Sequence, residues 1–246
     1  VTSVTISPST GIDTATALTC SATATDDDGD TPTFTYAWTN STEGTTLGTG
    51  STLTLTSSNS APSDTIVCTA TATDSDGGTD TGTDSVSVDN TDPVVTSVSI
   101  SPSTGVDTYT SLTCSATASD VDGDTPTLSY VWINSTDGTT LGTGASFDLD
   151  PAYAQPDDTI TCIATATDSE GDTDTGADSV TVDNTDPVVT SVTISPGSGV
   201  TTSTDLTCSA TATDDDGDTP TFTYVWSNDT EGTTLGTGTT VTLSSS

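Results

Sequence analysis

The chain has 246 residues and a formal net charge of −36, because it contains 36 Asp and Glu residues and no Lys, Arg or His. Without cationic side chains it can neither neutralise the phosphates of a nucleic acid nor supply an imidazole base or an amine nucleophile. It contains no run of 18 apolar residues, so we expect no membrane-spanning helix. We therefore expect no nucleic-acid partner and no enzymatic activity.

Apolar residues alternate with polar ones in several short segments of the first 94 residues. In chain order, these segments are residues 18–24, 34–38, 53–55, 66–72 and 86–88. A hydrophobic content of 29% with high net charge is typical of disordered chains. A disordered chain, however, has no reason to alternate, and a period of two predicts half-buried β-strands. About seven short strands separated by Gly- and Pro-containing turns are typical of a β-sandwich.

The pattern recurs every 94 residues along the whole chain. The same step separates Cys20, Cys114 and Cys208, and it separates Trp38, Trp132 and Trp226. We therefore predict an all-β fold of tandem immunoglobulin-like β-sandwich repeats at 1–92 and 93–186, with a partial third repeat at 187–246. Because both ends fall inside the repeat, we expect a longer array. The third repeat would be completed by its own continuation or by strands of another protomer.

The cysteines are spaced regularly within each repeat. Cys20 and Cys68 lie 48 residues apart, as do Cys114 and Cys162, and a Trp lies between them in sequence. Each cysteine falls on an inward-facing strand position, which is the arrangement of the inter-sheet disulfide of an immunoglobulin-like sandwich. The alternative is a pair of buried free thiols. Disulfides would place the chain in an oxidising compartment, outside the cell or at its surface.

Three motifs resemble known repeat families. Residues 70–78, followed by Val86-Ser87-Val88, resemble the last strands of PKD-type repeats, and the Cys–Trp–Cys spacing is similar to that of immunoglobulin-like domains. Residues 89–93 resemble the calcium-binding linker of cadherin-like repeats, without its second acidic-Asn step. Ile66 and Ile160 stand where immunoglobulin domains have a Tyr. The resemblance implies a stalk, adhesin or filament on a microbial surface.

Acidic residues gather in two loops of each repeat. In the predicted topology both loops lie at the same end of the sandwich, where the linker from the preceding repeat arrives. Carboxylates at alternate positions offer the oxygen ligands that Ca²⁺ prefers, although Asp and Gly are also ordinary turn residues. We predict structural Ca²⁺ at both junctions. The first set is Asp89, Asn90, Asp92, Asp120, Asp122, Asp124, Asp168, Glu170 and Asp172; the second is Asp183, Asn184, Asp186, Asp214, Asp216 and Asp218.

Three N-x-[ST] sequons follow the Trp-containing strands, at Asn40, Asn134 and Asn228. They predict N-glycosylation, although such triplets also arise by chance in a chain this rich in Ser and Thr. Glycans are therefore one expected partner of the chain. The three Trp residues could in principle stack on sugars, but their alternation places them in the core.

These features favour a structural function over a catalytic one. We expect a component of an extracellular filament or cell-surface stalk, stiffened by disulfides and inter-repeat calcium, whose partners are copies of itself. The alternative is an adhesin, or a carbohydrate-binding β-sandwich array that mediates cell attachment. Glycoside hydrolysis would need paired carboxylates with other converging groups, whereas the Asp pairs here occupy turns in every repeat.

Overall fold

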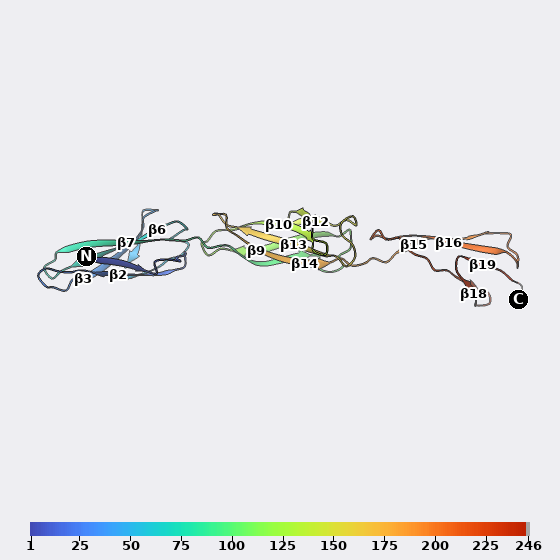
Figure 1. The fold of residues 1–246 in the computed structure, drawn as a ribbon, viewed down its shortest axis with the longest axis horizontal. Coiled ribbons are helices and arrows are strands. Elements are labelled where there is room, and N and C mark those ends of the chain that lie inside the picture. Colours follow the sequence, from blue (N-terminus) through green and yellow to red (C-terminus); the bar gives the residue numbers. More distant parts are fainter. Residues whose placement is uncertain (245–246) are drawn as a thin grey trace. The chain divides into compact units, whose positions relative to one another are not determined.

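A computed structural model describes residues 1–244, which form 19 β-strands (Figure 1). The described residues contain no helix, and hence none that is long and apolar enough to cross a membrane. The strands form antiparallel sheets that pair as β-sandwiches in tandem. The structure confirms the predicted all-β class of immunoglobulin-like repeats.

The first repeat consists of two sheets with the strand orders β1-β2-β5 and β4-β3-β6-β7. The strands are β1 (Ser3–Ser7), β2 (Ala17–Thr23), β3 (Thr33–Asn40), β4 (Thr45–Thr49), β5 (Thr52–Thr54), β6 (Thr65–Thr73) and β7 (Thr79–Ser87).

The second repeat has the same two sheets, β12-β9-β8 and β11-β10-β13-β14. Its strands are β8 (Val94–Ser101), β9 (Ser111–Ser119), β10 (Thr127–Asn134), β11 (Thr139–Thr143), β12 (Ser146–Asp148), β13 (Thr159–Thr167) and β14 (Thr173–Thr181). In the third repeat the described residues form the sheets β15-β16-β19 and β17-β18. Its strands are β15 (Val188–Ser195), β16 (Asp205–Thr213), β17 (Val225–Asn228), β18 (Thr233–Thr237) and β19 (Thr240–Thr242).

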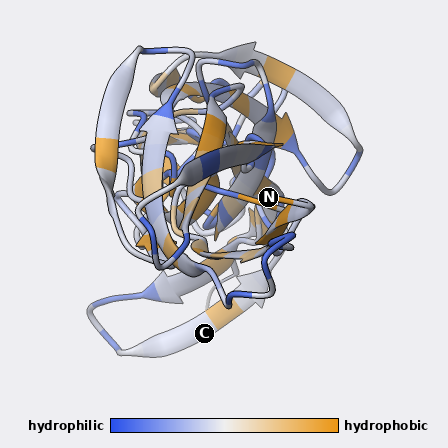
Figure 2. Cartoon of the chain, turned by 90° about the vertical axis from the view of Figure 1, so that its left-hand side faces the viewer, coloured by the Kyte–Doolittle hydropathy of each residue, from blue (hydrophilic) through white to orange (hydrophobic). Residues whose placement is uncertain are grey.

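The period of two in the sequence becomes the two faces of each strand. In β6 the residues from Ile66 to Ala72 alternate between buried apolar positions and half-buried positions that are mostly Thr. Thr is β-branched, so it suits the outer face of a strand without adding a large apolar surface. Figure 2 shows the result as short orange segments within otherwise pale strands. In β6 few apolar residues are enough, because every second residue from Ile66 to Ala72 is buried.

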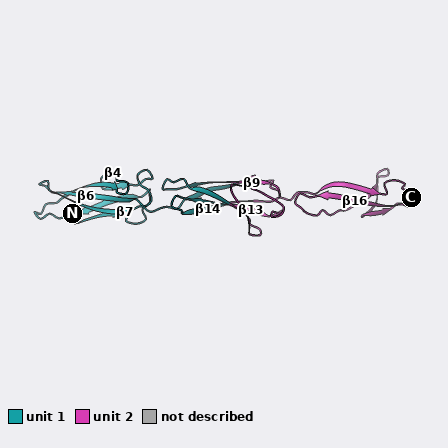
Figure 3. Cartoon of the chain, turned by 90° about the horizontal axis from the view of Figure 1, so that it is seen from above, with its two compact units in different colours: residues 1–99, 115–130, 163–177 teal, residues 100–114, 131–162, 178–246 magenta. Residues whose placement is uncertain are grey.

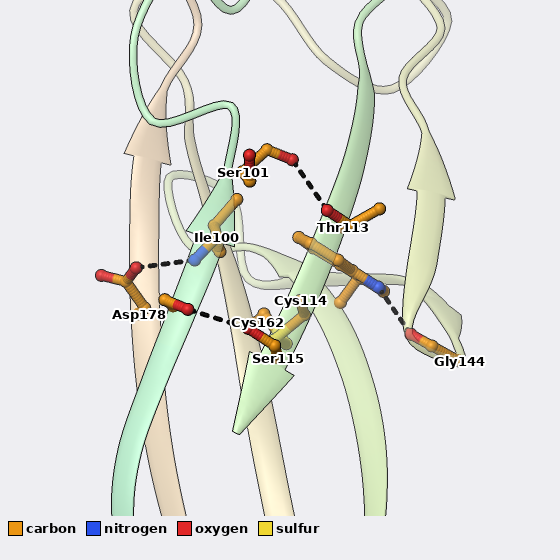
Figure 4. Close-up of a disulfide and its surroundings, with 10 residues drawn as sticks. Ile100, Ser101, Thr113, Cys114, Ser115, Gly144, Cys162 and Asp178 are labelled. Carbon is orange, nitrogen blue, oxygen red and sulfur yellow. Dashed lines mark hydrogen bonds between the residues drawn. A yellow bond between two sulfur atoms is a disulfide. The ribbon is translucent and has the colours of Figure 1, made fainter. Parts of the chain in front are cut away.

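Each complete repeat has a disulfide and a Trp at its centre. Cys20 bonds to Cys68 and Cys114 bonds to Cys162, each pair 48 residues apart, as predicted. Figure 4 shows the second disulfide beside Ile100, whose backbone N–H donates to Asp178. The side chain of Trp132 is fully buried, and its Nε1–H donates to the carbonyl of Gly144 at 2.9 Å.

The described chain divides into two compact units (Figure 3). One unit consists of residues 1–99, 115–130 and 163–177, and the other consists of residues 100–114, 131–162 and 178–246. The second repeat contributes to both units. The repeat boundaries that we expected at 92/93 and 186/187 stay predictions.

Candidate functional site

The linker between the first two repeats lies against two acidic loops of the second repeat, within one compact unit. The linker is residues 89–93; the first acidic loop, residues 120–124, follows β9, and the second acidic loop, residues 168–172, follows β13. Both loops lie where β10 begins, because the Thr127 hydroxyl of β10 donates to the carbonyl of Thr167 in β13 at 3.3 Å. The sandwich topology predicted this placement.

Asn90 of the linker joins the second acidic loop. Its Nδ2 amide donates to Asp168 Oδ2 and to Asp172 Oδ2, each at 2.9 Å. The hydrogen bond from Asn90 is the main reason that the pKa of Asp168 lies below its ordinary value. The other amide atom, Asn90 Oδ1, is buried and has no hydrogen-bond partner. The amide nitrogen thus stands where a cation would be expected between two carboxylates.

Asp120 of the first acidic loop has a second buried oxygen without a partner. Its Oδ1 accepts the backbone N–H of Asp122 at 2.7 Å, but its Oδ2 is buried and accepts no hydrogen bond. Burial raises the pKa of Asp120, and the charges of Asp122, Asp124 and Asp168 add to the rise. Within residues 1–244, Asn90 Oδ1 and Asp120 Oδ2 are the only buried side-chain oxygens or nitrogens without a partner.

Asp122 is held in the opposite way, because both of its oxygens accept hydrogen bonds. The side chain is buried; Oδ1 accepts from the Thr14 hydroxyl at 2.9 Å, and Oδ2 accepts from the N–H and hydroxyl of Thr91, each at 2.8 Å. Thr14 belongs to the loop between β1 and β2, so this carboxylate joins both repeats to the linker. We call this arrangement the clasp.

The second junction, within the other compact unit, repeats the clasp with Asp216. Asp216 is 1% exposed and accepts hydrogen bonds from Thr108 at 3.2 Å and from the N–H and hydroxyl of Thr185 at 2.6 and 2.8 Å. Burial alone would raise the pKa of Asp216, but the hydrogen bonds from Thr185 and Thr108 outweigh it and lower the pKa. Asn184 is exposed here, and its Nδ2 donates to the carbonyl of Thr185.

The remaining predicted ligands are less tightly held. Ser169 donates to Asp124 and to Glu170, each at 2.6 Å, and Asp214 accepts the backbone N–H of Asp216 at 2.9 Å. Four linker residues and two loop residues among these are exposed: Asp89, Asp92, Asp183, Asp186, Glu170 and Asp218. In residues 1–244, no group of three or more Asp, Glu, Cys or His side chains is already arranged around a possible metal position.

Two of the three sequons are buried. Asn40 and Asn134 are each 1% exposed, and their Nδ2 atoms donate to Asp64 at 2.6 Å and to Asp158 at 2.7 Å. A glycan on either nitrogen would have to break this bond and leave the core, so the folded chain disfavours glycosylation at both residues. Asn228 is half-buried, and glycosylation there stays a prediction.

Sequence reasoning missed the Thr residues of the clasp. Thr14 and Thr108 are separated by the 94-residue step, as are Thr91 and Thr185. This recurrence was a usable signal, but Thr is so frequent in the chain that a repeated Thr does not stand out. The acidic loops suggested metal ligands or turn residues, whereas Asp122 and Asp216 accept hydrogen bonds from Thr hydroxyls.

Comparisons with known proteins identify similar folds. No family model matches the chain, and no curated protein matches it. Several solved structures are similar. One is a tetra-tandem repeat from the extending region of a large adhesion protein (18% identity, 85% of this chain and 55% of that chain, TM-score 0.34). This chain therefore spans about 55% of that structure's length.

Two further solved structures are similar at comparable levels. A Ca²⁺-stabilized adhesin from an Antarctic bacterium shares 17% identity over 98% of this chain and 73% of that chain, with a TM-score of 0.33. An amphioxus IgVJ-C2 molecule shares 15% identity over 70% of this chain and 97% of that chain, with a TM-score of 0.35. Because the identities are 15–18% and the TM-scores 0.33–0.35, these similarities carry no conclusion about the function of this chain.

Proposed function

We propose that this chain is a structural spacer of an extracellular filament or cell-surface stalk, and that Ca²⁺ stiffens its first repeat junction. Its partners in this role are copies of itself. The two disulfides support an oxidising, extracellular location. The absence of Lys, Arg and His, which removes most catalytic groups, favours a structural role over a catalytic one.

The two orphaned oxygens at the first junction carry the calcium proposal. A buried polar atom without a partner costs about 1–3 kcal/mol, so natural folds rarely keep one without a compensating ligand. Here both orphans, Asn90 Oδ1 and Asp120 Oδ2, belong to the junction predicted to bind calcium. Both are hard oxygen donors, as Ca²⁺ requires. No cationic side chain can offset the negative charge of the first junction, because the chain has no Lys, Arg or His.

The proposed ligands are Asn90, Asp120, Asp168 and Asp172, with Asp124 adding negative charge nearby. A half-turn of the Asn90 amide exchanges Nδ2 and Oδ1. Without a cation the present orientation of the Asn90 amide is favoured, because Nδ2 donates to the carboxylates of Asp168 and Asp172. A cation bound between these carboxylates would favour the reverse orientation, since the amide oxygen would then face the cation. Asp122 is not among the ligands, because Thr14 and Thr91 already use its two oxygens.

Calcium titration of the full chain tests this proposal. We expect one tight site in calorimetry and a rise in thermal stability that reaches about 2.7 kcal/mol when calcium is one hundred times its dissociation constant. Asn90→Ala and Asp120→Asn should each abolish the tight site. Asn184→Ala, the matched change at the second junction, should leave it intact. Equal binding by the wild type and by Asp120→Asn would overturn the proposal.

A further inference from the structure

The strand β3 has an open edge in the first half of its length. β6 pairs with all of β3, from Thr33 to Asn40, whereas β4 pairs only with Ala37–Asn40. The chain leaves this edge at residues 49–51, where the backbone N–H of Gly50 donates to the carbonyl of Tyr36 at 3.0 Å. Beyond that bond, no strand of the described residues pairs with this edge of β3 at Phe34.

A groove lies beside this open edge. Its volume is about 620 Å³, within the range of small-ligand sites, and its lining includes Phe34, Thr35, Tyr36, Thr49, Ser51 and Thr71. No Asp or Glu lines it, although the chain carries 36 of them. The groove is thus an uncharged region, with aromatic carbon and hydroxyl groups, in a strongly anionic protein.

Two aromatic rings lie side by side in the lining. The ring centroids of Phe34 and Tyr36 are 6.3 Å apart and their planes differ by 21°. In the third repeat, Phe222 and Tyr224 repeat this pair at 6.2 Å and 27°, beside a groove of about 430 Å³. That groove also has no acidic residue in its lining. In the second repeat Leu128 takes the place of the Phe, so the aromatic pair is absent there.

We propose that the grooves at Phe34–Tyr36 and Phe222–Tyr224 bind a neutral polysaccharide presented by another surface. A pyranose ring has an apolar C–H face that packs on aromatic carbon, and its hydroxyls exchange hydrogen bonds with Thr and Ser hydroxyls. A cationic peptide would find no counter-charge in the lining. Glycans on the chain's own Asn40 and Asn134 are a poor source, because both side chains are buried.

Binding to neutral polysaccharides tests this inference on the full chain. The probes are linear glucan, mannan and galactan oligosaccharides at millimolar concentration. Their binding is measured by calorimetry in the presence of a calcium chelator. We expect one of them to bind at two sites. Phe34→Leu and Phe222→Leu should each weaken its own site about tenfold. Both variants should fold, since Leu128 is the natural residue at this position of the second repeat.

A gain-of-function variant completes the test. Leu128→Phe should raise the number of sugar sites from two to three, whereas Tyr109→Leu, at a 61% exposed residue outside both grooves, should change nothing. Failure of all the oligosaccharides to bind would overturn the proposal, as would binding unchanged in the Phe34→Leu/Phe222→Leu double variant. Phe34-dependent binding of a neutral Ser/Thr-rich peptide, without sugar binding, would instead identify a strand-docking edge. Because the chelator removes calcium, none of these outcomes depends on the junction site.

Discussion

The two repeat junctions use the same clasp but differ in the linker Asn. At the first junction Asp122 accepts hydrogen bonds from Thr14 and Thr91, and at the second Asp216 accepts them from Thr108 and Thr185. Asn90, by contrast, donates to two carboxylates of the second acidic loop, whereas Asn184 donates only to the carbonyl of the next residue.

The difference distinguishes two arrangements at the junctions, the clasp and the contacts of Asn90. The clasp needs only the loop between the first two strands of a repeat, the linker and the first acidic loop of the next repeat, and its donors are Thr hydroxyls and a backbone N–H. The Asn90 contacts also need the second acidic loop, whose counterpart in the third repeat is not among the described residues. The clasp and the proposed calcium site therefore use different carboxylates of the first acidic loop, Asp122 and Asp120, which are two residues apart.

The largest predicted effect comes from removing the clasp. Asp122→Ala and Asp216→Ala should each destabilise their junction by about 2–4 kcal/mol, because each leaves the backbone N–H and the hydroxyl of the linker Thr, Thr91 or Thr185, without an acceptor. Hydrogen exchange at the Thr91 and Thr185 amides reports the two junctions separately. A similar loss of exchange protection at both amides would confirm that the clasp is common to the two junctions.

The controls are exposed linker carboxylates. Asp92→Ala and Asp186→Ala should change the free energy of opening, as measured by hydrogen exchange at the Thr91 and Thr185 amides, by less than about 0.5 kcal/mol. A large loss at only one junction would mean that the clasp is not equivalent in the two places.

An intermediate effect is expected at a glycine of the first acidic loop. Gly123 has φ +91°, and a Cβ there would come within 2.7 Å of the Ser57 Cβ in the first repeat. At the matching Gly217, φ is +84°, but the nearest atom is the Pro151 Cβ at 3.9 Å. Gly217→Ala should therefore cost about 1 kcal/mol from backbone strain alone, and Gly123→Ala about 1–2 kcal/mol more.

Urea unfolding of the two alanine variants measures this difference. Adding Ser57→Gly to Gly123→Ala should bring its cost down to that of Gly217→Ala. If the two single variants were equally stable, the close approach of the repeats at Gly123 would carry no energetic weight.

The smallest effect concerns the pH dependence of the folding stability, to which Asp120 and Asp216 contribute with opposite signs. The pKa of Asp120 is raised, so its charged form opposes folding at neutral pH, and this penalty fades as the pH falls through its folded pKa. Asp120→Asn should therefore stabilise the calcium-free chain at neutral pH and have little effect in acid. The pKa of Asp216 is lowered, so its contribution is present above the ordinary value of 3.8 and is lost as the pH falls below it.

The midpoint of urea unfolding in chelator, measured from neutral pH to below 3.8, checks both signs. The charged groups facing Asp120 are Asp122, Asp124 and Asp168, and all of them are acids, so their charges add to the penalty on its charged form. A lower midpoint for Asp120→Asn at neutral pH would show that its charged form is stabilised rather than penalised.

The sequence predicted the fold well because alternation is a local property of strands. It placed Trp38, Cys20 and Cys68 in the core, and it also placed Asn90 beside the second acidic loop through topology alone. The same alternation could have corrected the sequon prediction, because Asn40 is two residues from Trp38 and so points to the same buried face. The clasp was not predictable in this way, because Thr14 meets Asp122 across 108 residues through loops without periodicity.

The 48-residue spacing of the disulfides also has a consequence for how the chain oxidises. Cys68 and Cys114, which belong to neighbouring repeats, lie 46 residues apart, almost the same separation as the bonded pairs. Loop-closure entropy varies only with the logarithm of loop length, so it cannot distinguish the correct partner from the wrong one. The packing of the β1-β2-β5 sheet on the β4-β3-β6-β7 sheet, which brings Cys20 of β2 to Cys68 of β6, must therefore precede oxidation if each thiol is to find its own repeat. In tandem repeats with the same cysteine spacing, the packing of the two sheets is the step that protects against covalent cross-linking of neighbours.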